Sequence, residues 1–187
     1  MANPDSLPSE YVLDSDDVIA EVSPAFLAFA QENDAPGLTA SALIGAPIWN
    51  FVAGTPTREI YAACFERVRS TLRTVTLPFR CDSPTCRRIM ELTVVPGAEQ
   101  SIRLSAVLLR AETRLAVPLL DPRIERSGEI LEACSFCRRI RIDDATWLDV
   151  EEAVGRLGLF DSPQLPMLSH GVCPACLPEL QRRLGLG

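Results

Sequence analysis

The stretch Thr74-Val75-Thr76-Leu77-Pro78-Phe79-Arg80-Cys81 alternates apolar side chains with threonine, proline and arginine. This period of two predicts a β-strand with one buried face. A second strand is predicted at about 88–95, where Pro96-Gly97 ends it, and a third follows. In the third strand the alternating apolar residues are Ile102, Leu104, Ala106 and Leu108. We therefore expect three consecutive strands joined in a meander.

The residues before this meander predict two further strands and several helices. Within 11–19, two short apolar runs flank an acidic turn, as in a β-hairpin. Ser23-Pro24 is typical of an N-cap followed by proline at the first helical position. An interrupted helix is predicted at 42–51, and Thr57 is predicted to cap a clearer one. The apolar residues at helical spacing in that helix are Ile60, Tyr61, Cys64, Phe65, Val68 and Leu72.

The order of two strands, short helices and three strands resembles the PAS domain over about residues 8–113. Within it, Leu43-Ile44-Gly45-Ala46-Pro47-Ile48-Trp49-Asn50-Phe51 is similar to the G-x-x-(I/L)-W-D-F stretch of that family. The resemblance implies an α+β fold with a five-stranded antiparallel sheet cupped by helices, in a sensor module that binds a ligand or dimerises. We expect this PAS-like domain at residues 8–116 and a proline-containing linker at 117–131.

Two C-x2-C pairs lie in the last third of the chain, at Cys134 and Cys137 and at Cys173 and Cys176. Four thiolates at this spacing can surround one zinc ion in a closed structural site. The sequence therefore predicts a small Zn²⁺-binding segment at 132–187. An iron–sulfur cluster also takes four cysteines and is the alternative cofactor. Buried thiols or two separate redox pairs would need no metal.

The residues around these pairs also resemble a known extension. Residues 134–141, Trp147 and residues 169–176 look like a cysteine-rich segment found after PAS domains in bacterial signalling proteins. The resemblance covers about 132–184. It implies a module that acts through a protein partner or through its own assembly, so we expect a homodimer. His170, three residues before Cys173, could replace a cysteine as a metal ligand, but we expect it to support the ligands without binding the metal or to fix a local turn.

Cys81 and Cys86 flank a turn-rich stretch between two predicted strands. In a four-residue hairpin loop they would face each other at a distance that a disulfide can span. A redox pair is one hypothesis, and two unrelated thiols in a reducing compartment is the other.

The predicted cup offers a ligand pocket lined by apolar side chains. The candidates are Phe26, Phe29, Trp49, Phe51, Phe65, Leu77 and Phe79. The alternative is that these side chains only form the core of the domain.

The composition limits the function further. The chain has 187 residues, a net charge of −7 and a pI near 4.8, so a nucleic-acid partner is not expected. No segment is apolar enough to span a membrane, and the N-terminal residues do not begin a signal peptide. With seven cysteines, we expect a reducing cytoplasm.

No sequence motif of a nucleophile, a phosphate loop or a catalytic metal is present, so we expect no enzymatic activity. The sequence predicts a non-catalytic sensory or interaction module in bacterial signal transduction. The alternative is a thiol-based redox sensor that releases zinc or forms disulfides on oxidation.

Overall fold

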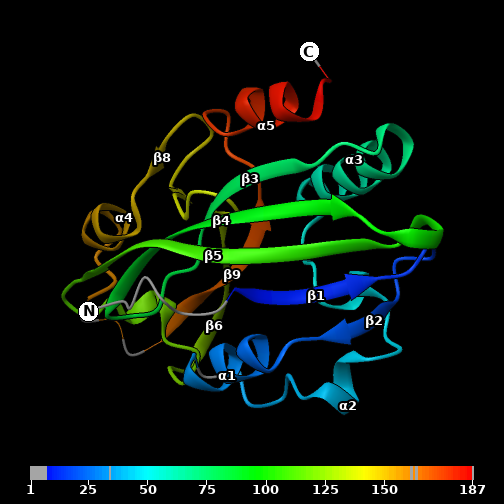
Figure 1. Cartoon of the computed structure of the whole chain (residues 1–187). Helices are drawn as coiled ribbons and strands as arrows, with labels where there is room; N and C mark the ends of the chain where they lie inside the picture. The colour runs from blue at the N-terminus through cyan, green and yellow to red at the C-terminus, as the bar shows by residue number, and fades with distance from the viewer. Residues whose placement is uncertain (1–7, 34, 161, 163, 187) are drawn as a thin grey trace.

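The computed structural model describes residues 8–33, 35–160, 162 and 164–186. Five antiparallel strands form the larger sheet, in the spatial order β2-β1-β5-β4-β3 (Figure 1). They are β1 (Ser9–Leu13), β2 (Ile19–Val22), β3 (Val75–Arg80), β4 (Cys86–Pro96) and β5 (Ile102–Thr113). The predicted α+β class and five-stranded antiparallel sheet with flanking helices are confirmed.

Helices and helical turns connect the strands. They are α1 (Pro24–Glu32), α2 (Ala40–Leu43), η1 (Ile48–Asn50), α3 (Thr55–Thr71), η2 (Ala98–Gln100), η3 (Pro118–Leu120), α4 (Val150–Arg156) and α5 (Leu177–Leu184). Ser23 caps α1 as predicted, because its hydroxyl accepts the Phe26 N–H at 3.1 Å. The interrupted helix expected at 42–51 is two separate pieces, α2 and η1, because Gly45 adopts a φ of 86° between them.

The prediction that Thr57 caps the long helix is wrong. Gly54 occupies the N-cap position of α3, and Pro56 lies in the first turn. Thr57 falls inside that turn, where its side chain is buried and bonds to another segment.

A second, smaller sheet was not predicted. Its strands are β6 (Arg126–Cys134), β7 (Ile140–Arg141), β8 (Trp147–Leu148) and β9 (Leu165–Gly171), in the order β8-β7-β6-β9. β6 and β9 run parallel, and the other pairs are antiparallel. The stretch 117–131, expected as a linker, contains η3 and the first part of β6. It is ordered in this way because Val117 and Leu119 are buried in a core beneath α4 and β6.

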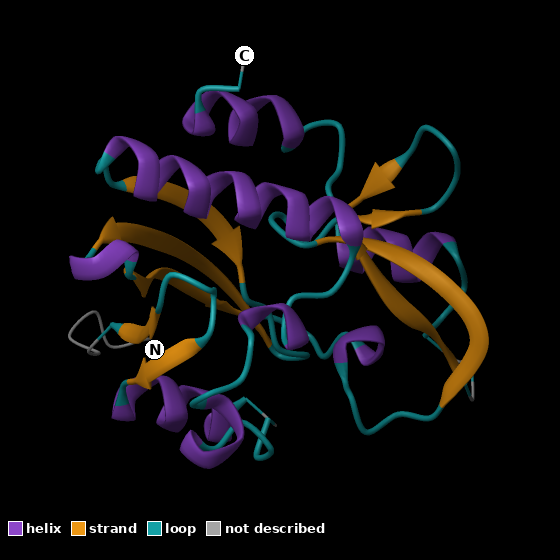
Figure 2. Cartoon of the chain, turned by 90° about the vertical axis from the view of Figure 1, so that its right-hand side faces the viewer, coloured by secondary structure: helices purple, strands orange, loops and turns teal. Residues whose placement is uncertain are grey.

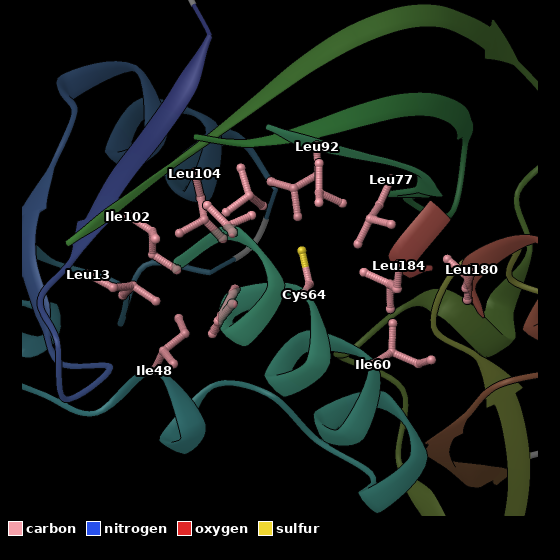
Figure 3. Close-up of a cluster of buried hydrophobic side chains, with 14 of the residues drawn as sticks. Leu13, Ile48, Ile60, Cys64, Leu77, Leu92, Ile102, Leu104, Leu180 and Leu184 are labelled. Carbon is pink, nitrogen blue, oxygen red and sulfur yellow. The ribbon is translucent and has the colours of Figure 1, made fainter. Parts of the chain in front are cut away.

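The main core lies between the larger sheet and α3, with Cys64 of α3 at its centre (Figure 3). Leu180 and Leu184 of α5 belong to the same core and lie near Leu77 and Ile60. Figure 2 shows α5 running beside α3 at one end of the molecule. The cysteine-rich segment is therefore packed onto the larger sheet and its helix. No helix among the described residues is long and apolar enough to cross a membrane.

Candidate metal centre

The parallel pairing of β6 and β9 brings the two C-x2-C turns together. Cys134 ends β6 and is the register partner of Gly171, the last residue of β9. Cys173 follows two residues later, so both turns emerge at the same end of the small sheet. In the first turn, Arg138 adopts a φ of 62° and its N–H donates to the Cys134 carbonyl at 3.0 Å. In the second, the Cys176 N–H donates to the Cys173 carbonyl at 3.0 Å.

The four cysteine sulfurs form a compact cluster. All four Sγ atoms lie within 4.8 Å of one another, and those of Cys137 and Cys173 are 3.5 Å apart. Zinc at about 2.3 Å from each sulfur of a tetrahedron requires sulfurs about 3.8 Å apart, so the donor set fits such an ion. The backbone N–H of Cys173 also donates to Cys134 Sγ at 3.4 Å. Cys134 and Cys173 are fully buried, and Cys137 and Cys176 are partly buried. The residues predicted as metal ligands are thus brought together.

The thiols of the cluster are also coupled to one another through hydrogen bonds. Hydrogen bonds from the Cys137 and Cys176 thiols, together with backbone N–H groups, hold the pKa of Cys134 far below its ordinary value. Donation to Cys134 raises the pKa values of Cys137 and Cys176. The Cys134 thiolate therefore accepts hydrogen bonds from two neighbouring thiols. A bound metal ion would take the place of those thiol protons.

Polar contacts fasten the first cysteine turn to the rest of the protein. The Ser135 hydroxyl lies 2.7 Å from the Thr57 hydroxyl of α3, and the Ser135 N–H donates to the Gly171 carbonyl at 2.9 Å. The Arg80 guanidinium donates to the Cys137 carbonyl at 3.0 Å. The turn is therefore held by α3, by β9 and by the edge strand β3.

His170 lies on β9 opposite Ala133 and is not among the four residues of the cluster. Burial lowers the pKa of its imidazole, and the charge of Arg138 lowers it further. The backbone of His170 packs closely against Gly54. A Cβ added to Gly54 would lie 1.9 Å from the His170 carbonyl oxygen. The supporting role predicted for the imidazole stays a prediction.

The geometric premise of the Cys81–Cys86 hypothesis is wrong. The Cys81 N–H donates to the Arg88 carbonyl at 3.1 Å, and Cys86 pairs with Ser83. The loop is shorter than expected because Ser83 and Cys86 exchange two backbone hydrogen bonds around Pro84-Thr85. The two cysteines are therefore not register partners, and all seven cysteines are free thiols.

Two adjoining cavities of about 260 Å³ and about 220 Å³ lie in the predicted cup and share Tyr11, Phe26 and Tyr61. Of the seven predicted pocket residues, four line these cavities: Phe26, Phe29, Phe51 and Phe79. The other three do not line them: Phe65 and Leu77 are buried in the core, and Trp49 packs on Phe65.

The sequence analysis missed the two tyrosines of the cup. Burial raises the pKa of the Tyr11 phenol and raises the pKa of Tyr61 to about 12. Both phenols that line the cavities therefore stay neutral at neutral pH. Tyr11 begins the predicted hairpin and Tyr61 lies on the apolar face of the predicted helix, so their positions were a signal. A ligand role for the cup stays a prediction.

A buried ion-pair network was also missed. The Asp82 side chain is fully buried and pairs with both Arg80 and Arg114. Arg114 continues to Glu151 of α4 at 2.7 Å, and Arg80 reaches Asp149 at 3.1 Å. The network joins the β3–β4 loop to the start of α4. Asp82 is unremarkable in the sequence because Arg114, its second partner, is distant along the chain.

No family model matches this chain, and no curated protein matches it. Among solved structures, the PAS domain of Bordetella pertussis BvgS is 18% identical and covers 56% of this chain and 73% of its own, with a TM-score of 0.38. The Aer2 receptor of Vibrio cholerae, a dual PAS-heme oxygen sensor, is 14% identical and covers 55% and 95%, with a TM-score of 0.37. The PAS domain of an HTR-like protein from Haloarcula marismortui is 18% identical and covers 57% and 84%, with a TM-score of 0.36.

Proposed function

We propose that this chain is a PAS-like, non-catalytic sensory or interaction module of bacterial signal transduction, whose cysteine-rich segment is held by one Zn²⁺. The observation that carries the proposal is the place of the sulfur cluster. Cys134 and Cys173 are buried in the same core as Leu77 of β3 and Leu180 of α5. A metal at this point would fix the C-terminal segment against the sheet and so complete a single rigid surface.

The donor set favours zinc and a structural role. Cys134, Cys137, Cys173 and Cys176 would hold the ion, and bound zinc would supply a cross-link between the two turns. Four protein ligands leave no open position for a substrate or a water molecule, which supports a role in binding. An iron–sulfur cluster remains the alternative occupant of the same cysteines.

Elemental mass spectrometry with a visible spectrum tests the metal directly, on protein purified anaerobically without added metal. We expect one zinc per chain and no colour. Cys173→Ser should lose the zinc, whereas Cys81→Ser, a matched change outside the cluster, should keep it. Iron together with a broad visible band would show that an iron–sulfur cluster, and not zinc, occupies the site. Wild-type protein that is folded and free of metal would overturn the proposal.

Self-association and a reducing compartment are parts of the same proposal. We propose that the PAS-like sheet mediates a homodimer or a contact with a protein partner, because exposed Leu109 lies on β5, the central strand. We propose the cytoplasm because seven cysteines without a disulfide are typical of a reducing compartment. The cup cavities beside Tyr61 are the place proposed for a small ligand.

A second candidate, a thiol-based redox sensor, is favoured by a groove beside the cluster. A groove of about 330 Å³ reaches Cys137 and Cys176 and is lined by Phe79 of β3 and Leu180 of α5. An oxidant entering here would meet these two sulfurs, whereas Cys134 and Cys173 are enclosed. Two thiolates would lose two electrons to hydrogen peroxide, which takes up two protons from solvent and becomes two water molecules, and the resulting disulfide would release the metal.

Peroxide titration with a zinc-sensitive dye separates the two candidates. The sensor requires zinc release at mild doses, together with a Cys137–Cys176 disulfide in a peptide map. Zinc that stays bound under these conditions would exclude the redox sensor and support the structural role.

A further inference from the structure

A pocket of about 430 Å³ lies outside the cup, between the η3 segment and β9. Leu120, Met167 and Leu168 form part of its apolar lining. Three charged residues also line it: Asp82, Arg126 and Arg138. The lining is therefore mixed, and the volume of the pocket lies within the range of small-molecule sites.

The charge in this pocket is not balanced. The Nε of Arg138 is buried without a hydrogen-bond partner, and no carboxylate of the described residues pairs with its guanidinium. Arg126 donates only to backbone carbonyls, among them that of Asp121 at 2.6 Å. Asp82 is already paired with Arg80 and Arg114. Arg138 is half-buried and lines the pocket without a carboxylate partner among the described residues, so an anion that reached its terminal nitrogens would gain a charge-assisted hydrogen bond.

Arg138 joins the first cysteine turn to this pocket. Its backbone closes the first cysteine turn, and its side chain lines the pocket beside Leu168. His170 follows Leu168 by two residues on β9, so the two side chains share a face of the strand. Burial and the nearby Arg138 both lower the pKa of His170, which keeps this neighbour uncharged at neutral pH. The guanidinium is thus the cation available to a ligand here.

We propose that this pocket binds a monocarboxylate with a short apolar chain. The carboxylate accepts from the terminal N–H groups of the Arg138 guanidinium, since the Nε itself is enclosed by protein, and a planar guanidinium suits a carboxylate. The chain lies along Leu120 and Leu168 and ends near Met167, which is 44% exposed at the rim. This site is separate from the metal cluster and from the cup, so it does not depend on the proposed function.

Isothermal titration of the full chain, as purified, with sodium octanoate tests the site. 1-Octanol, which lacks the carboxylate, and inorganic phosphate, which lacks the apolar chain, are the control probes. We expect octanoate to bind and to shift the Arg138 Nε–H resonance in a ¹⁵N spectrum. Arg138→Gln should weaken octanoate binding about tenfold or more, because it removes a charge-assisted hydrogen bond. Zinc content measured for this variant shows whether the adjacent cysteine turn is intact.

A second pair of variants keeps the test decisive if Arg138→Gln does not fold. Met167 and Ile130 are exposed register partners on neighbouring strands, and only Met167 lines the pocket. Met167→Asp should weaken octanoate binding, and Ile130→Asp should not. Equal effects of these two changes, unchanged binding by Arg138→Gln, or equally tight binding of octanol or phosphate would each overturn the proposal.

Discussion

The backbone N–H of Arg80 donates to the carbonyl oxygen of Phe136 at 2.7 Å, so the edge strand of the larger sheet is bonded to the first cysteine turn. β3 is an edge strand, and such strands expose unpaired backbone groups. Arg183 of α5 covers the same edge by donating to the Thr76 carbonyl at 2.9 Å. The cysteine-rich segment therefore protects the edge of the sheet, and a metal in the cluster would stabilise that protection.

Removal of metal should expose the Arg80 amide to solvent. A strong chelator would loosen the first cysteine turn, because its sulfurs would lose their common ligand. Hydrogen–deuterium exchange followed by mass spectrometry should show faster exchange at Arg80 in the chelated protein. The Val94 amide, inside the ladder of the larger sheet, is the internal control. Unchanged exchange at Arg80 in metal-free protein would contradict a metal-dependent edge.

Gly54→Ala should destabilise the protein by about 3 kcal/mol. Gly54 has a φ of 82°, and an added Cβ would lie 1.9 Å from the His170 carbonyl oxygen. The backbone of β9 would have to move, which would also disturb the adjacent cysteine turns. Gly128→Ala is the matched control, since nothing lies within 4 Å of its added Cβ. Urea unfolding measures the stability of both variants. Similar midpoints would show that the β9 backbone can shift with little loss of stability.

The sequence predicted the parts of this fold that depend on local patterns. The period of two around Val75 and Leu77 identified β3, and the Ser23-Pro24 pair marked the start of α1. The C-x2-C spacing identified all four members of the sulfur cluster, because a short turn by itself sets the distance within each pair.

The parts that were missed depend on contacts between distant residues. β7 and β8 have two residues each, too few for any period to appear. The parallel pairing of β6 with β9 joins segments far apart in the chain. The hairpin loop was misplaced because Asp82 accepts the Arg88 N–H at 3.2 Å, which helps to set a register that spacing alone did not indicate.

Glu151 should contribute stability that is lost in acid. Burial would raise the pKa of this carboxyl, but hydrogen bonds from Arg114 and Arg87 outweigh it and lower the pKa from 4.5 to about 2. The unfolded chain therefore takes up the proton first as the pH falls. The stabilisation is complete above about pH 4.5 and disappears towards pH 2.

Comparison of the wild type with Glu151→Gln isolates this effect, because both proteins carry the same cysteine cluster. After allowance for the exposure of this side chain, we expect the wild type to be more stable by roughly 1–2 kcal/mol at pH 6. That difference should shrink by pH 3 in urea unfolding. A difference independent of pH would show that the ion pair to Arg114 is not its source.

Leu109→Glu should weaken self-association. Leu109 is the extra residue where the register of β4 and β5 shifts, and bulges of this kind turn a side chain outward. It is 59% exposed on the central strand of the larger sheet, where an isolated leucine faces solvent. If this face is the dimer contact, burial of Leu109 contributes about 1.5–3 kcal/mol, and its loss raises the dimer Kd roughly 10–100-fold.

Light scattering after size-exclusion chromatography over a range of protein concentrations measures the effect. Leu115→Glu is the matched control, because Leu115 is 92% exposed and lies beyond the end of β5. The control should dimerise as the wild type does. A wild type that stays monomeric, or a Leu109→Glu variant that dimerises equally well, would place the partner surface away from this strand.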